Sequence, residues 1–101
     1  MKRCRIHRLA NQDLADSAWW YEEREPGLGT DFVEEVEHTI ELITRNPLAC
    51  ATWPPNRRFR KRPVQRFDHI VFFEVVDGSV HILAVAHSRR RPGYWRRRAS
   101  T

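Results

Sequence analysis

A chain of 101 residues, 41% of them hydrophobic, is long enough for one packed domain and too short for two, so we expect residues 1–101 to form a single domain. No apolar run approaches the roughly 20 residues of a membrane-spanning helix, and no signal-peptide stretch follows the basic start, which predicts a cytoplasmic protein. Cys4 and Cys50 have no Cys or His nearby at zinc-ligand spacing. We expect no metal and two reduced thiols, with a disulfide between them as the alternative.

The net charge of +5 is distributed unevenly along the chain. Residues 1–56 hold 6 basic and 10 acidic side chains, whereas residues 57–101 hold 12 basic and 3 acidic ones. The basic groups gather at 57–62 and 89–98, and nearly all are arginines, whose guanidinium groups suit phosphate and carboxylate. We interpret these clusters as a surface for a polyanion or an acidic protein; the alternative is a solvated face that aids solubility.

The first half of the chain predicts one strand and two helices. Residues 2–9 alternate apolar and polar side chains, as a half-buried strand does. Helical spacing then predicts a helix from about 12 to 24, with Asn11 as its N-cap and Asp13 in its first turn, where the helix dipole favours a negative charge. A Pro/Gly turn breaks this helix, and a second one follows from about Thr30 until a proline ends it.

Strand-like segments dominate the second half of the chain. A basic extended segment at 59–64 precedes an Ile-, Val- and Phe-rich run at 67–76. Asp77 and Gly78 then form the preferred pair of a type I′ turn, and residues 80–86 return as the partner strand. The sequence therefore predicts a β-hairpin with a two-residue turn.

The predicted order of elements is β-α-α-β-β-β. Strands that follow a helical hairpin favour an α+β fold, in which this α-hairpin packs on one face of a small antiparallel sheet. The loop at 47–56 is expected to wrap over the core through Trp53, and the tail from Ser88 onward to be irregular or a short terminal turn. We expect the other face of the sheet, with this loop and tail, to present the arginines.

This order of elements, together with several short motifs, resembles the RelE/ParE toxins of bacterial type II toxin–antitoxin modules. The motifs lie at 10–14, 20–23, 29–32, Pro47 and 80–95. The last is the most specific, because it is similar to the final strand and arginine-rich end of ParE-like members. The resemblance implies a toxin that arrests growth and acts in plasmid stabilisation, with no cofactor. It also implies a cognate antitoxin that wraps the toxin in a toxin–antitoxin hetero-oligomer.

The resemblance leaves two activities open. ParE-like members inhibit DNA gyrase, whereas RelE-like members are mRNA interferases that cut mRNA, usually on the ribosome. The ParE-like end of the chain favours gyrase inhibition, with an mRNA endoribonuclease as the alternative. A third interpretation is a non-toxic basic module that binds nucleic acid. Whether the protein is an enzyme depends on which of these activities it has.

Candidate site residues cluster near the C-terminal end. Those expected to bind the target are Arg89, Arg90, Arg91, Tyr94, Trp95 and Arg96. An endoribonuclease would need a base, an acid and cationic groups around the scissile phosphate. In that case His87 would act as base or acid, Arg66 and Arg90 would stabilise charge, and Tyr94 would be a further acid or a stacking group.

Two positions depart from the RelE-like pattern: Ile70 stands where an arginine is usual, and Phe73 where many members have a tyrosine. The proposed site residues also have structural interpretations. His87 would cap the end of its strand through a backbone hydrogen bond, and Tyr94 and Trp95 would pack over the edge of the core.

The remaining aromatic and histidine side chains carry expectations of their own. Trp19, Trp20 and Trp53 are expected to fill the helix–sheet interface or a groove that receives the antitoxin. His69 and His81 are expected at the surface of the sheet.

Overall fold

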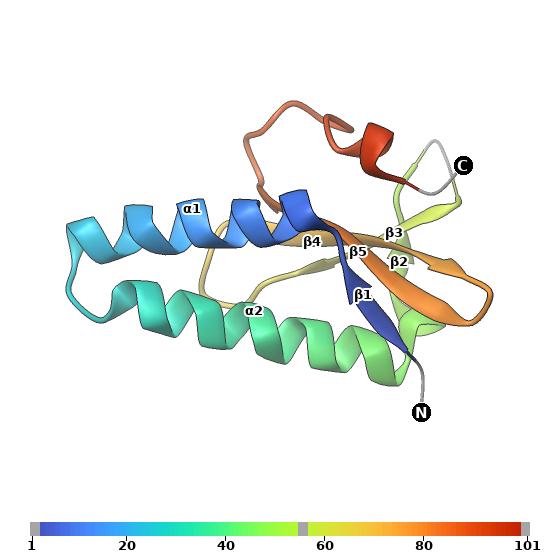
Figure 1. The fold of residues 1–101 in the computed structure, drawn as a ribbon, viewed down its shortest axis with the longest axis horizontal. Helices are drawn as coiled ribbons and strands as arrows, with labels where there is room; N and C mark the ends of the chain where they lie inside the picture. Colours follow the sequence, from blue (N-terminus) through green and yellow to red (C-terminus); the bar gives the residue numbers. More distant parts are fainter. Residues whose placement is uncertain (1–2, 55–56, 100–101) are drawn as a thin grey trace.

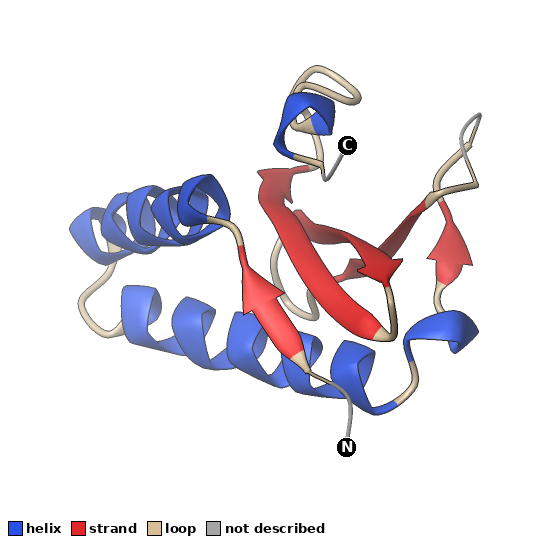
Figure 2. Ribbon diagram, turned by 45° about the vertical axis from the view of Figure 1, so that its right-hand side comes forward, coloured by secondary structure: helices blue, strands red, loops and turns tan. Residues whose placement is uncertain are grey.

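The computed structural model describes residues 3–54 and 57–99, and in it two helices lie along one face of a sheet (Figures 1 and 2). The helices are α1 (Arg8–Arg24) and α2 (Leu28–Arg45), and short 3-10 helices follow at Pro47–Ala49 and Arg96–Arg98. The strands are β1 (Cys4–Ile6), β2 (Ala51–Thr52), β3 (Phe59–Pro63), β4 (His69–Val76) and β5 (Ser79–His87). The predicted α+β class and the predicted order are confirmed, with the two-residue β2 as an addition inside the predicted loop.

The sheet has five strands in the order β1-β5-β4-β3-β2. Neighbours from β5 to β2 are antiparallel, but β1 runs parallel to β5, with Cys4 opposite Val80 and Ile6 opposite Ile82. The sheet is therefore mixed at one edge, where a wholly antiparallel sheet was expected. A parallel pair needs a long crossover, which the helical hairpin and the sheet strands after it supply. Because the pairing joins distant parts of the chain, no local pattern in β1 reveals it.

Helix α1 begins at Arg8, earlier than predicted, because a histidine caps it. The imidazole Nδ1 of His7 accepts a hydrogen bond from the backbone N–H of Leu9 at 3.0 Å. Asn11 therefore lies inside the helix, and Asp13 lies beyond the first turn, so both predictions for this helix end are wrong. The preceding strand is shorter than predicted, and its three side chains are exposed rather than half-buried.

The predicted turn between the last two strands is confirmed. Both turn residues have positive φ, 50° at Asp77 and 77° at Gly78, as a type I′ turn requires. Val76 lies opposite Ser79, so the strands pair up to the turn itself. The local chemistry of this pair of residues fixes the register of the hairpin.

The two helices approach closely at Gly29, which lies inside α2 rather than in the turn. The carboxylate of Glu22 on α1 accepts hydrogen bonds from the backbone N–H groups of Gly27 at 2.9 Å and Gly29 at 3.0 Å. A negative charge thus lies at the N-terminus of α2, where the helix dipole favours it. A Cβ on Gly29 would lie 2.5 Å from the carbonyl oxygen of Ala18, which is well inside contact distance.

We expect Gly29→Ala to lower the free energy of unfolding by about 2 kcal/mol, because the backbone oxygen of Ala18 cannot move aside unless the helices separate. Urea denaturation followed by circular dichroism measures this change. Thr30→Ala is the matched control: its side chain is exposed in the same turn, so we expect little effect. Equal stability of the two variants would contradict the close approach.

Apolar side chains pack on both faces of the sheet. The cluster under the helices includes Phe32, Val36, Ile43, Val71, Phe73 and Ile82. The cluster on the opposite face consists of Phe59, Phe72, Leu83, Ala84, Ala86 and Trp95. We call this opposite side the tail face, because the chain beyond β5 covers it. The arginines that were expected on this face therefore surround a second apolar layer.

The tryptophans and one histidine lie elsewhere than expected. Trp19 and Trp20 are 66% and 50% exposed, and Trp53 packs with the cluster on the tail face. None of the three fills the helix–sheet interface, so that alternative is wrong, and a groove for the antitoxin stays a prediction. His69 is only 4% exposed, which corrects its expected position at the surface, whereas His81 is half-buried. Cys4 is exposed, Cys50 is buried, and both are free thiols.

Candidate functional site

The chain beyond β5 (red in Figure 1) folds back over the tail face and is anchored there by Trp95. The Trp95 side chain is 1% exposed and stacks on Phe72 with the ring centroids 4.6 Å apart. The rings of Phe59 and Trp53 meet it edge-on at 4.9 and 5.2 Å. The packing interpretation of Trp95 is therefore confirmed, and its ring is not accessible to a target in this conformation.

A second anchor joins the tail to α1 through Asp13. The Asp13 carboxylate accepts hydrogen bonds from Arg98 Nη1 at 2.7 Å, from the Val85 backbone N–H at 3.1 Å and from the Tyr94 hydroxyl at 3.4 Å. Arg98 Nη1 also donates to the carbonyl oxygen of Leu83 at 3.0 Å. Burial raises the pKa of Tyr94, and the nearby Asp13 carboxylate adds to this rise.

These contacts have a physical cause in the length of β1. Because β1 pairs only as far as Ile82, the following part of β5 has β4 on one side but no strand on the side where β1 ends. The backbone N–H of Val85 and the carbonyl of Leu83 lie in that part and would otherwise lack partners. Asp13 of α1 and Arg98 of the tail supply the missing acceptor and donor, so these two side chains take the place of a strand at this edge.

The exposed arginines of the tail lie outside these anchors. Four of them, with Tyr94, are called the tail surface: Arg89, Arg90, Arg91, Tyr94 and Arg96; Arg97 is exposed as well but is not included. Arg90 lies over the Tyr94 ring, with its guanidinium carbon 4.0 Å from the centroid. Within residues 3–54 and 57–99, none of the four arginines makes an ion pair with a carboxylate. The tail thus holds several uncompensated positive charges on a segment that is fixed from beneath.

The nuclease candidates are only partly brought together. His87, Arg90 and Tyr94 line one small hollow of about 140 Å³ on the tail face, but Arg66 is not among its walls. Arg66 instead forms an ion pair with Asp31 on α2 at 3.6 Å. The Nδ1 of His87 accepts a hydrogen bond from the backbone N–H of Arg89 at 3.1 Å, which confirms its interpretation as a cap of the strand end.

Part of the basic segment at 57–62 has a structural role that the charge pattern did not reveal. Arg58 Nε donates to the fully buried carboxylate of Glu74 at 2.7 Å. Arg60 Nη1 donates to the carbonyl oxygens of Cys50 at 2.8 Å and Leu48 at 3.3 Å, and so holds the chain before β2. Only some of this predicted recognition cluster is therefore free to meet a partner.

We expect Arg58→Ala to lower the free energy of unfolding by about 2 kcal/mol, because it leaves the carboxylate of Glu74 buried without this partner. The expected loss is below that for a fully buried pair, since the Arg58 side chain is 45% exposed. Arg57→Ala removes the same charge from the neighbouring exposed position and serves as the control. Urea denaturation of both variants checks the difference, and an equal loss would contradict the pairing.

A third group of polar side chains surrounds His69 beneath α1. His69 Nε2 lies 3.2 Å from the Ser17 hydroxyl, and Nδ1 lies 3.4 Å from the Tyr21 hydroxyl. The ring meets that of His87 edge-on at 5.1 Å, and a hollow of about 460 Å³ opens beside both. Burial, reinforced by His87 and opposed by Asp68, lowers the pKa of His69 to about 4. The imidazole is therefore neutral near pH 7.

Comparison with known families decides the classification. The family described as "ParE toxin of type II toxin-antitoxin system, parDE" matches residues 4–92. The chain belongs to the ParE toxin family. A solved structure described as "Chromosomal ParDE TA system from P. aeruginosa" has 18% sequence identity and a TM-score of 0.77, and the match covers 86% of this chain and 96% of that one. At this identity the likeness supports the fold alone. Among curated protein sequences, none matches this chain.

The ParE match divides the tail. It includes β5, His87 and the run Arg89–Arg91, and it stops before Tyr94 and Trp95. The anchor made by Trp95 and Arg98 therefore lies beyond the part of this ParE-family chain that the family match covers. Within residues 3–54 and 57–99, no helix is long and apolar enough to cross a membrane.

Proposed function

We propose that this ParE-family toxin arrests bacterial growth by binding DNA gyrase through its tail surface. The observation that carries the proposal is the set of exposed arginines that meet no carboxylate and lie on an anchored segment. A segment already held in one conformation loses less entropy when it binds a partner, which favours affinity. Gyrase acts on chromosomal DNA, so the proposal also places the protein in the cytoplasm.

The geometry supports binding rather than chemistry at the tail. His87, the candidate base, already accepts a backbone hydrogen bond at Nδ1, and Arg66 is held by Asp31 outside the hollow. Phe73, the position where many RelE-like members have a tyrosine, is fully buried under the helices. Tyr94 and the arginines remain as groups that can contact an anionic or hydrogen-bonding surface of the target.

The first experiment is a pulse of induced expression in bacteria, with uptake of labelled thymidine and labelled amino acid followed together. We expect DNA synthesis to fail first, and inhibition of supercoiling by purified gyrase to follow. If protein synthesis fails first, gyrase is not the target. If growth continues and neither uptake falls, the non-toxic basic module becomes the better interpretation.

Point variants test the tail surface better than truncation does. Removing the chain after His87 would also remove Trp95 and Arg98 and so uncover the tail face. The double variant Arg89→Ala/Arg91→Ala keeps these anchors, and we expect it to lose gyrase inhibition. The control Arg24→Ala/Arg45→Ala removes the same charge from exposed positions in the last turns of the two helices.

In the gyrase assay, the tail variant should require about tenfold more protein for the same inhibition, as the loss of charged contacts at an interface does. The helix control should inhibit like the unmodified protein. Equal inhibition by the tail variant and the control would remove the tail surface from the proposal.

An mRNA endoribonuclease is the second candidate, because His87, Arg90 and Tyr94 line one hollow. In that case alanine at all three positions should abolish cleavage of mRNA without unfolding the protein. Full cleavage by the triple variant would exclude this site. If the protein is an endoribonuclease, its target is the ribosome or mRNA and not gyrase.

We further propose that a cognate antitoxin covers the outer groove of the helical hairpin. Membership of a toxin–antitoxin family supports such a partner. The groove, about 400 Å³, is lined by Trp19, by Glu22 and by small or apolar residues of both helices. An amphipathic helix fits a groove of this kind. Trp19→Arg should weaken binding of the antitoxin encoded beside the toxin gene, whereas Leu48→Arg, at another exposed apolar residue, should not.

A further inference from the structure

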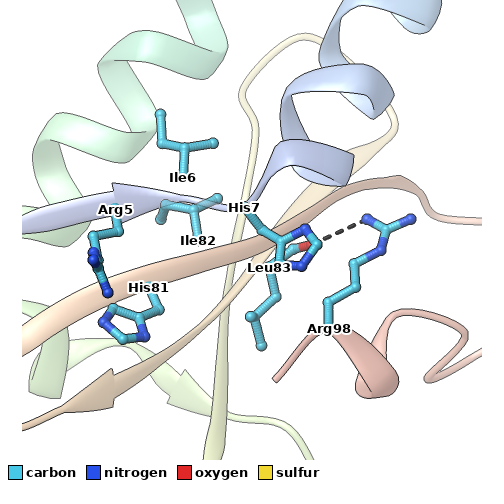
Figure 3. Close-up of a pocket in the computed structure, with 7 residues that line it drawn as sticks. All are labelled: Arg5, Ile6, His7, His81, Ile82, Leu83 and Arg98. Carbon is cyan, nitrogen blue, oxygen red and sulfur yellow. Dashed lines mark hydrogen bonds between the residues drawn. The ribbon is translucent and has the colours of Figure 1, made fainter. Parts of the chain in front are cut away.

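A pocket at the free edge of the sheet lies apart from the tail surface (Figure 3). Its volume is about 260 Å³, and β1, β5 and the 3-10 helix of the tail contribute its walls. The residues that line it are Arg5, Ile6, His7, His81, Ile82, Leu83 and Arg98. In Figure 3 Ile6 and Ile82 point toward the helices, whereas Arg5 and His81 lie side by side on the opposite side.

The donors around this pocket come from three separate segments. Arg5 and His81 are register partners across β1 and β5, which places their side chains next to each other. The Nδ1 of His7 accepts the hydrogen bond from Leu9, so its Nε2 carries the proton and is a donor. Arg98 is fixed by Asp13 and the Leu83 carbonyl, and not all of its N–H groups are used in these bonds.

The charges near the pocket favour an anion. Asp13 is already matched by Arg98, and Glu74, which lies opposite His81 on β4, is already bound by Arg58. Arg5 is exposed and makes no ion pair within residues 3–54 and 57–99. The positive charge of Arg5 is therefore not balanced by an ion pair within this part of the chain.

The start of α1 adds to this preference. His7 is the N-cap of a helix of 17 residues, and the first turn of that helix holds no acidic side chain. The positive end of the helix dipole therefore lies beside the pocket without a counter-charge. Arg8 at the first helical position and Arg3, which the alternation of a strand places on the same face as Arg5, extend the basic surface.

We propose that this pocket binds a phosphate group. Guanidinium and imidazole groups from β1, β5 and the tail line this one pocket, and an anion with several oxygens can accept from more than one of them. The pocket has room for such a group together with ordered water, at roughly 30 Å³ per water. Either the backbone of a nucleic acid or a free phosphate compound can supply the group. The proposal does not rest on gyrase inhibition, because it uses none of the residues of the tail surface.

The first arm of the test is a titration of the isotope-labelled full chain with inorganic phosphate, followed by NMR, against chloride at equal ionic strength. We expect phosphate, and not chloride, to shift the signals of Arg5, His81 and Leu83 in a saturable way. Arg5→Glu should weaken this binding about tenfold or more, and Arg5→Lys should retain most of it.

Arg24→Glu is the matched control for charge. It makes the same change at an exposed position at the far end of α1, roughly 24 Å along the helix from Arg8. If Arg24→Glu and Arg5→Glu weaken phosphate binding equally, only the net charge of the protein matters, and the proposal of a specific phosphate site in this pocket is wrong. Shifts that phosphate and chloride produce alike overturn it too.

The second arm distinguishes the sources of the phosphate. Binding of a short DNA duplex is measured at several salt concentrations for the unmodified protein, Arg5→Glu and Arg24→Glu. If a nucleic-acid backbone is the source, the duplex displaces inorganic phosphate. Arg5→Glu then reduces the slope of log K against log salt concentration by about one, as the loss of one phosphate contact does. If the duplex does not displace inorganic phosphate, the ligand of the pocket is a free phosphate compound, and a nucleic-acid backbone is excluded as its ligand.

Discussion

Replacing Asp13 by alanine is expected to lower the free energy of unfolding by about 3 kcal/mol, because it breaks a largely buried ion pair from one side. The side chains of Asp13 and Arg98 are only 14% and 13% exposed. Without the carboxylate, the guanidinium of Arg98 stays buried with no counter-charge, and the backbone N–H of Val85 loses its acceptor. Either loss alone is costly in a site that water reaches poorly.

Two further variants separate the charge from the hydrogen bonds. Asp13→Asn keeps an oxygen for the Val85 N–H but removes the charge, so we expect a smaller loss than with alanine. The double variant Asp13→Ala/Arg98→Met removes both charges, and its loss should be smaller than the sum of the two single losses. Urea denaturation near pH 7 measures Asp13→Ala, Asp13→Asn, Arg98→Met and the double variant. Losses that add up would contradict a direct coupling between Asp13 and Arg98.

The elements that local sequence signals specify were predicted well. Asp77 and Gly78 supply the positive φ angles that a two-residue turn needs, and the residues on either side pair as that turn dictates. The second helix, predicted from about Thr30 to a proline, is α2, whose buried side chains include Phe32, Val36 and Ile43. In each case the information lies within a few residues of the element itself, so reading the chain in order is enough.

What the sequence did not reveal depends on contacts between distant residues. The parallel pairing of β1 with β5 joins Cys4 to Val80, and no pattern within β1 identifies that partner. Asp13 was interpreted as a residue of the first helical turn, although it binds the tail and the edge of β5. The start of α1 was missed because an imidazole nitrogen, rather than the usual side-chain oxygen, caps it.

The sequence predicted which residues belong to the candidate site better than it predicted how they are arranged. The exposed run Arg89–Arg91 lies where the charge pattern indicated, and His87 and Tyr94 do lie near each other. Charge counting alone cannot tell an arginine that is free from one that is already bound, which is why Arg58 was taken for a recognition residue. It also passed over Arg5, whose surroundings become basic only when β1 lies beside β5.

Acidification is expected to destabilise the protein through His69. Burial, with a smaller contribution from His87 and against Asp68, lowers the pKa of His69 from its ordinary 6.5 to about 4 in the folded protein. Between these two values the unfolded chain binds more protons than the folded one, so stability rises with pH. This contribution is fully present above about pH 6.5 and is lost as the pH falls toward 4. The total loss is about 3 kcal/mol, at about 1.4 kcal/mol for each unit of pKa.

Other groups titrate in the same range, so the contribution of His69 is measured as a difference. His69→Gln keeps polar atoms near Ser17 and Tyr21 but cannot take up a proton. Between pH 7.5 and 4.5 the unmodified protein should therefore lose about 2–3 kcal/mol more of its unfolding free energy than the variant does. An NMR titration should show the ring of His69 protonating near pH 4. Parallel stability profiles, or a ring that titrates near its ordinary value, would mean that protons reach this imidazole freely and that the packing of α1 over β4 does not exclude water.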